Sequence, residues 1–299
     1  MRHRLEYAPV WLLATVLRLL PRSLARAMAI ALAQTVRLLH GRLRRVGMRN
    51  LEIAFPEKTA GQRRRILREV FTNLGRLLAE FCRFPNYHRG NVSEVAVYEG
   101  FENFDKARRR GKGILFLTAH LGGWEIGSFV HSVHGNLVRI VVRPLDNPFL
   151  HRMVLRYRTL HGNTCFEKQD FARGLLAATK AGETVGILMD TNQTPPQGIF
   201  VPFFKVPACT ASGLARVALR TDASVIPAFT LWDDALGKYR VHFAPALALV
   251  RTGNEEADVV ANTALFTRVL EDYIRKYPGQ WLWVHRRWKT RPPGEAAVY

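Results

Sequence analysis

Several features that define common protein classes are scarce or missing in this sequence. Its 299 residues include only 3 cysteines, at positions 82, 165 and 209, and these lie far apart with no CxxC or Cys/His pairing. A disulfide framework is therefore excluded, and each thiol is interpreted as a small core residue in a reducing compartment. No glycine-rich loop of the GxxxxGK or GxGxxG kind is present, so no nucleotide cofactor is predicted. No other cofactor and no metal is expected either.

Acidic residues are also scarce. Lys and Arg together number 44 against 24 Asp and Glu, which gives a formal net charge of +20. A charge of this size favours contact with a polyanion: nucleic acid, an anionic membrane surface, or an acidic protein or ligand. The hydrophobic content of 48% permits a full core in one large domain with a small appendage.

The N-terminal region has two apolar segments, but neither is uninterrupted. Residues 7–20 contain Arg18, and residues 24–39 contain Arg26 and Arg37. A bilayer crossing needs about 20 mainly apolar residues, and no convincing signal-peptide cleavage site follows. We expect one membrane-anchoring helix and then an interfacial helix, with the arginines at an anionic surface. The alternative is a soluble amphipathic pair that caps the domain.

Strand and helix patterns alternate through the rest of the chain. Helical spacing of apolar residues over 59–84 predicts an arm, and alternation beyond residue 99 indicates an α/β fold whose sites lie at the carboxyl ends of strands. We divide the chain into 1–45 (membrane helices), 46–98 (helical arm) and 99–299 (α/β domain with a basic-aromatic tail). Strands are expected at 113–118, 137–142, 183–189, 223–229 and 239–243, and helices at 125–134, 147–160, 171–181, 211–219 and 258–277.

The candidate site lies where the strand at 113–118 ends. His120 follows this strand, and Gly122 and Gly123 then lead into a helix that carries Glu125 in its first turn. Glycines permit a tight turn or close approach to a ligand, and free N–H groups in the first turn can hold an anion. A histidine oriented by a carboxylate is a suitable general base at neutral pH. Because no serine or cysteine nucleophile is evident, direct attack by a hydroxyl on an activated acyl group is simpler than an acyl-enzyme route.

Spacing alone leaves other interpretations of His120 open. A structural histidine is the commoner outcome, and a zinc pair is less favoured because helical metal ligands prefer i, i+4 spacing and no third ligand is evident. His131 and His134 are interpreted as structural residues at a helix end.

The segment from His120 to Glu125 resembles the HX4(D/E) signature of the glycerolipid acyltransferase superfamily. The surrounding sequence resembles the bacterial lipid A late acyltransferases, the lauroyl and myristoyl transferases. Ala119 and Gly123 depart from the commoner asparagines, and these variants also resemble phosphatidylinositol mannoside acyltransferases of the mycobacterial type. Further matching blocks span residues 143–148, 190–193, 198–204, 210–229 and 281–292, so the resemblance covers nearly the whole chain.

The resemblance implies a central mixed β-sheet flanked by helices, with catalysis in residues 99–299. It implies a membrane-bound O-acyltransferase that moves a fatty acyl chain from an acyl-acyl carrier protein thioester to a hydroxyl of a lipid A precursor. His120 would be the base and Glu125 its orienting carboxylate. Arg158 is the first candidate for holding the donor or the developing oxyanion, and Arg143 the second.

Other site residues are predicted to bind substrate or support the site. For Arg143 with Asp146 a salt-bridged turn is an equal alternative, and Asp190 and Asn192 could be turn or helix caps. Phe203 and Phe204 are interpreted as core. The supporting residues are Gly122, Gly123, Arg143, Asp146, Asn147, Arg156, Asp190 and Asn192.

The predicted partners are acyl carrier protein, an anionic glycolipid acceptor and the membrane, without nucleic acid. The expected location is the bacterial inner membrane, with the catalytic domain on the cytoplasmic side. One alternative is transfer to another glycolipid or a lysophospholipid, with acyl-CoA as a further donor. An alternative of a different class is a nonenzymatic basic protein that binds membranes or nucleic acid, because tryptophans interleaved with arginines in residues 281–291 could stack on bases.

Overall fold

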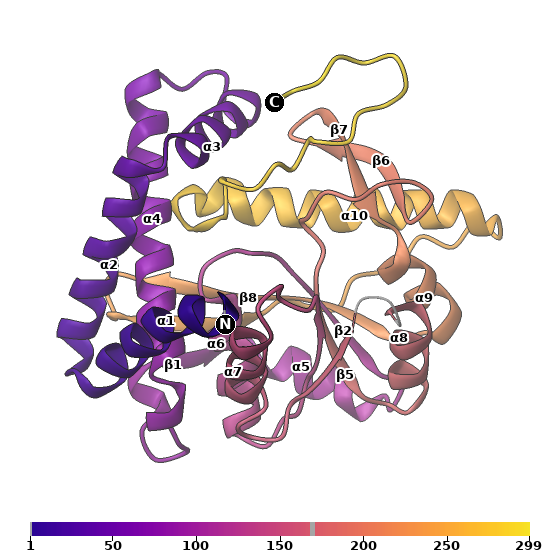
Figure 1. The fold of residues 1–299 in the computed structure, drawn as a ribbon. Helices are drawn as coiled ribbons and strands as arrows, with labels where there is room; N and C mark the ends of the chain where they lie inside the picture. Colours follow the sequence, from indigo (N-terminus) through magenta and orange to yellow (C-terminus); the bar gives the residue numbers. More distant parts are fainter. Residues whose placement is uncertain (1, 168–170) are drawn as a thin grey trace.

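A mixed β-sheet forms the centre of the molecule. The computed structural model describes residues 2–167 and 171–299, and within them seven strands pair in the order β1-β9-β8-β2-β5-β3-β4. The five from β8 to β4 are parallel, β9 is antiparallel to β8, and β1 is parallel to β9. The predicted mixed sheet is thus confirmed (Figure 1). The strands are β1 (Ala96–Glu99), β2 (Ile114–Thr118), β3 (Arg139–Val142), β4 (Thr164–Glu167), β5 (Thr184–Leu188), β8 (Ser224–Asp233) and β9 (Lys238–Phe243).

Helices cover both faces of the sheet. Successive strand residues point to opposite sides, so apolar side chains lie on each face and pack beneath helices. In β2, Leu115 and Leu117 join the core beneath α8 (Phe171–Lys180), α9 (Gly213–Thr221) and α10 (Glu255–Lys276). We call this side the α10 face. Ile114 and Phe116 join the core beneath α5 (Phe101–Arg109) and α6 (Trp124–Val133), the α6 face. In Figure 1, α10 lies on one side of the sheet, and α5, α6 and α7 (Pro148–Arg158) lie on the other.

Four helices precede the sheet: α1 (Arg2–Leu19), α2 (Arg22–Leu39), α3 (Gly41–Ala54) and α4 (Ala60–Cys82). A capping box formed by Thr59 and Gln62 begins α4. At Gly75, an added Cβ would come within 2.5 Å of the Ile30 Cα, so this glycine permits the close approach of α2 and α4. The helix predicted over residues 59–84 is therefore present as α4, and it packs against the N-terminal helices (Figure 1).

The N-terminal apolar segments are helical, as expected, but within the described residues no helix combines the length and apolarity that crossing a bilayer requires. Large apolar side chains on α1 and α2 are nevertheless exposed. They include Trp11, Leu12, Leu19, Leu38 and Leu39.

The predicted strands and helices of the α/β domain are confirmed with small shifts of their ends, and β8 is longer than expected. The sequence patterns did not reveal α3, β1, α5, β4 or the hairpin of β6 (Gly198–Phe203) and β7 (Val206–Ala211). In this hairpin Pro202 lies opposite Pro207. Proline lacks the N–H that a strand ladder uses, so its presence argues against strand assignment from sequence.

The basic-aromatic tail belongs to the core. Trp281, Trp283 and Trp288 are buried, as is Arg287. The Arg287 guanidinium donates to the Cys209 carbonyl at 2.8 Å, and burial lowers its pKa to about 10. The nucleic-acid-binding alternative depended on these tryptophans stacking on bases. Because they are buried, they are not available for stacking, and that support is lost. Phe203 and Phe204 are buried among the same rings, as predicted.

Candidate active site

His120 and Asp190 meet where two neighbouring parallel strands end. Thr118 of β2 pairs with Leu188 of β5, and the Met189 N–H donates to the Thr118 carbonyl at 3.0 Å. Each titratable residue lies two positions beyond its strand, so the shared register brings the two side chains together. This is the carboxyl edge of the sheet, where sites in α/β folds are expected.

The Asp190 carboxylate holds the histidine through side chain and backbone. Its Oδ1 lies 2.9 Å from Nδ1 of His120, and its Oδ2 accepts the His120 backbone N–H at 2.9 Å and the Trp281 indole N–H at 2.7 Å. Burial by itself would raise the pKa of Asp190, which is 3% exposed, but His120 and these donors hold it well below its usual range. Asp190 is thus ionised, favours a proton on Nδ1 and leaves Nε2 of His120 free to accept a proton.

The surroundings of His120 adjust its basicity. Burial lowers its pKa, whereas the adjacent Asp190 carboxylate raises it, and the pKa ends above its ordinary value. The Trp124 ring stands edge-on to the imidazole, with centroids 5.2 Å apart, and the Leu282 N–H donates to the His120 carbonyl at 3.0 Å. The histidine is therefore a strengthened base with a fixed orientation.

The structure corrects the expected partner of His120. Glu125 does not contact Nδ1; both of its oxygens accept from Arg158, Oε2 from Nε at 2.8 Å and Oε1 from Nη2 at 2.5 Å. Glu125 is the second residue of α6 and reaches toward α7, whereas Asp190 emerges from the strand beside β2. The orienting contact predicted for Glu125 is thus made by Asp190, which the sequence indicated only as a supporting or capping residue.

Arg158, predicted to hold the donor or oxyanion, lines a pocket together with Glu125. Its side chain is 20% exposed. Burial lowers its pKa, but the Glu125 carboxylate raises it above the ordinary value. Within the described part of the chain Nη1 makes no hydrogen bond, so this nitrogen can still donate to a ligand.

The glycine pair allows the loop after His120 to lie directly on β8. Gly122 has φ +65°, and a Cβ there would lie 2.0 Å from the Thr230 carbonyl oxygen. The Gly123 N–H donates to that oxygen at 2.6 Å. The predicted tight turn is present, and the close approach is to the protein's own backbone.

Asn147 has a structural role. Its Oδ1 accepts the N–H groups of Phe149 and Leu150 and so caps α7, while its Nδ2 donates to the His3 carbonyl of α1 at 2.8 Å. With 6% of its surface exposed, this side chain is fully used within the protein. It ties the N-terminal helix to the helix that carries Arg158.

Three other predicted residues, Arg143, Asp146 and Arg156, are exposed. Arg143 and Asp146 form no ion pair with each other in residues 2–167 and 171–299, so the salt-bridged turn is not observed. Asn192 holds the C-terminal tail instead: its Oδ1 accepts the Thr290 N–H at 2.9 Å, and its own N–H donates to Nε2 of His285 at 3.2 Å.

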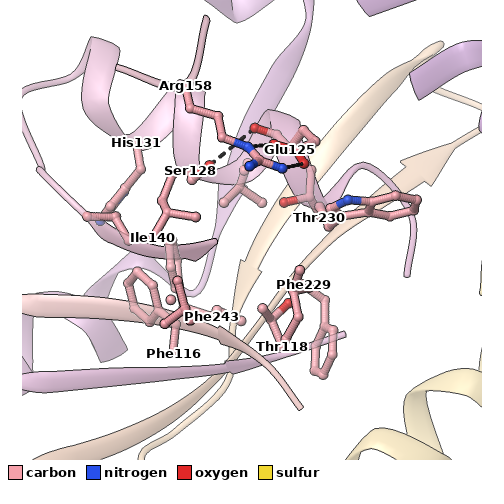
Figure 2. A pocket seen from close by; sticks show the side chains of 18 residues that line it. Phe116, Thr118, Glu125, Ser128, His131, Ile140, Arg158, Phe229, Thr230 and Phe243 are labelled. Carbon is pink, nitrogen blue, oxygen red and sulfur yellow. Dashed lines mark hydrogen bonds and ion pairs between the residues drawn. The ribbon is translucent and has the colours of Figure 1, made fainter. Parts of the chain in front are cut away.

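A pocket opens on the α6 face (Figure 2), and Trp124, whose ring contacts His120, is one of its lining residues. The empty space within it, counted together with its opening to solvent, is about 740 Å³. The Glu125–Arg158 pair lies at one side and Phe116 and Phe243 at another. The rest of the wall includes apolar side chains of β3, β5, β8 and β9, among them Ile140, Leu188 and Val241. Sequence patterns missed this pocket, because its lining residues look like ordinary core.

The fold and site together define an α/β enzyme that combines a carboxylate-oriented histidine with a largely apolar pocket. The chain matches the family model described as bacterial lipid A biosynthesis acyltransferase over residues 2–290. It belongs to this family, and it is an acyltransferase of lipid A biosynthesis.

Curated lipid A acyltransferases also match this chain over most of its length. The Escherichia coli lipid A biosynthesis lauroyltransferase is 30% identical over 84% of this chain and 80% of its own length. The palmitoleoyltransferase of the same organism is 26% identical over 85% and 81%, and the myristoyltransferase is 22% identical over 86% and 78%. The identification as an acyltransferase is thus shown independently of the site geometry.

Proposed function

We propose that this enzyme transfers a fatty acyl chain from an acyl-acyl carrier protein thioester to a hydroxyl of a lipid A precursor, with His120 as general base and Asp190 as its orienting carboxylate. The observation that carries this mechanism is the hydrogen bond between Asp190 and Nδ1 of His120 beside an apolar pocket. The relatives are named for lauroyl, palmitoleoyl and myristoyl transfer, so similarity supports the reaction without selecting a chain length.

The reaction needs one proton transfer in each direction. Nε2 of His120 takes the proton from the acceptor hydroxyl as its oxygen attacks the thioester carbonyl carbon. When the tetrahedral intermediate collapses, the carbon–sulfur bond breaks and the imidazolium returns the proton to the departing thiolate. Asp190 stabilises the imidazolium between these steps, so no covalent acyl-enzyme is required.

The Glu125–Arg158 pair has a different role in this mechanism. The pair keeps the guanidinium at the pocket, and the unused Nη1 of Arg158 can donate to the thioester carbonyl oxygen as negative charge develops there. The N–H groups of Trp124 and Glu125, in the first turn of α6, add positive potential beside the same reacting group.

The positive charge and the exposed apolar side chains support a location at the inner membrane, with residues 99–299 as the catalytic domain on the cytoplasmic side. Carrier protein is acidic, lipid A precursors are phosphorylated and the leaflet is anionic, so one charge bias serves all three encounters. Residues 1–45 would lie on the membrane through the exposed leucines and Trp11 of α1 and α2, and residues 46–98 would join them to the catalytic domain. Arg143 and Arg156 are the exposed candidates for contact with acidic substrate groups.

The test is transfer by the purified full chain in lipid vesicles, followed by mass spectrometry. Acyl carrier protein and acyl-CoA donors are each paired with a lipid A precursor, a phosphatidylinositol mannoside and a lysophospholipid. We expect one acyl group to be added to the lipid A precursor from the carrier protein donor. Faster transfer to either other acceptor, or from acyl-CoA, would overturn this assignment.

A further inference from the structure

One central strand lacks a side chain where its neighbours have large ones. Gly186, in the middle of β5, pairs with Phe116 of β2 and Ile140 of β3. Val185 and Ile187 join the core of the α10 face, so by alternation position 186 faces α6 and the pocket. A glycine inside a strand weakens it and often marks the close approach of a ligand.

The backbone at Gly186 does not require glycine. Its φ is outside the left-handed region, and an added Cβ would meet a single atom within 4 Å, Cγ1 of Val138 at 3.4 Å. By contrast, a Cβ at Gly122 or Gly113 would collide with backbone atoms. The missing side chain at 186 therefore leaves open space in the pocket without serving a tight turn or a backbone contact.

The pocket continues past Gly186 along α6. From Trp124 to His131 the helix rises by about 10 Å at 1.5 Å per residue, and both residues line the pocket. His131 is 1% exposed, its Nδ1 lies 3.0 Å from the Tyr98 hydroxyl, and its Nε2 has no hydrogen-bond partner within the described residues. Burial lowers the pKa of His131 to about 3, so the ring is neutral. Together with Phe116 and Phe243 it forms an uncharged wall away from the Glu125–Arg158 pair (Figure 2).

We propose that this pocket holds the fatty acyl chain of the donor, and that Gly186 and His131 together set the length of chain it accepts. This inference rests on the proposed function. The transferred chain begins at the carbonyl carbon that the acceptor hydroxyl attacks, and this carbon must lie near Nε2 of His120. Trp124 contacts His120 and also lines the pocket, so a chain that starts at this carbon has the pocket as its adjacent apolar space.

The test offers two acyl carrier protein donors of different chain length in one mixture, with one acceptor, and measures the ratio of products. This ratio compares kcat/KM values and does not depend on how much enzyme is folded. Gly186→Val places two methyl groups in the pocket, and we expect it to reduce the preference for the longer donor by about tenfold or more, as for a hydrophobic pocket that loses room for a methylene group. Gly186→Ala should shift the ratio in the same direction by less.

His131→Ala removes part of the wall and should shift the ratio toward longer donors. The matched control is Gly61→Val, which alters an exposed glycine near the start of α4 and should leave the ratio unchanged. An unchanged ratio in both Gly186 variants would overturn the inference, as would a ratio that moves equally in the control.

A second series keeps the donor constant and varies the acyl chains of the acceptor. If Gly186→Val changes selection among acceptors but not among donors, the pocket holds the acceptor's chain and the donor assignment is wrong. Wild-type transfer in the same assays distinguishes a failure of the proposed function from a failure of the role given to the pocket. Absent transfer by the wild type contradicts the proposed function, whereas normal transfer with an unchanged variant ratio contradicts the role of the pocket alone.

Discussion

The pair His120–Asp190 and the pair Glu125–Arg158 are built in different ways. His120 and Asp190 follow adjacent parallel strands, and Asp190 is nearly inaccessible and bound by three donor groups. Glu125 and Arg158 come from two helices and form a bidentate pair whose side chains are 15% and 20% exposed. The first pair leaves Nε2 free for proton transfer, whereas both carboxylate oxygens of the second are occupied. The difference supports our proposal that the acid of the HX4E motif positions an arginine and that a more distant aspartate positions the base.

The largest effect is expected at the base itself. His120→Ala should lower kcat on the order of 10⁴-fold, at the upper end of what a general base contributes, with membrane association unchanged. The measurement is single-turnover transfer to the lipid A precursor. The exposed His88 provides a control, since His88→Ala should keep normal activity. Activity of His120→Ala close to that of the wild type would contradict the mechanism.

Asp190→Asn is expected to lower kcat/KM on the order of 10³-fold, because it removes the charge that stabilises the imidazolium. The pH profile distinguishes orientation from structural damage. His120 must be neutral to act as the base, and Asp190 raises its pKa. The acidic limb of the wild-type profile, where activity falls because His120 becomes protonated, should therefore lie above the ordinary histidine value of about 6.5. In Asp190→Asn this limb should move to lower pH.

The exposed Asp222 gives a matched control for that charge change, because it pairs only with surface arginines in the described structure. Asp222→Asn should keep both the rate and the position of the limb. If Glu125→Gln moved the limb as far as Asp190→Asn does, the distinction between the two pairs would fail.

The second pair should affect stability as well as the rate, because the proposed mechanism also uses Arg158 to stabilise the developing charge. Arg158→Met leaves the Glu125 carboxylate partly buried without a partner, and we expect a loss of about 2 kcal/mol in the free energy of unfolding. Adding Glu125→Met should recover part of this loss, since the double variant no longer has an unpaired charge. Urea denaturation of wild type, both single variants and the double variant measures the coupling. Strict additivity would show that the two side chains act independently.

The smallest change is Trp281→Phe, which removes one hydrogen bond to Asp190 and keeps an aromatic ring in the core. Loss of one hydrogen bond to a charged group corresponds to about tenfold in kcat/KM. The acidic limb should move in the same direction as in Asp190→Asn, by less. Trp283→Phe, whose indole donates to the Pro278 carbonyl, is the matched control and should not move it.

The local parts of the fold could be read from the sequence. The apolar run at 113–118, the glycine pair and the helix beginning near residue 124 indicated β2, the turn and α6, and so placed His120 at a strand end. Short or proline-containing strands such as β1, β4 and the β6–β7 hairpin escaped because too few residues carry their pattern. The tail at 281–291 was misleading, because its arginines suggested a surface while its tryptophans were core.

The sequence by itself determined the α/β class, the positive charge and the place of His120 at the end of a strand, because these follow from local periodicity and composition. Only the tertiary structure decided which carboxylate orients the histidine. In the chain β3 follows β2, but in the sheet β5 lies next to it, so Asp190 reaches His120 and Glu125 turns to Arg158. Strand order depends on how distant segments pack together, and the spacing of residues along the chain does not contain that information.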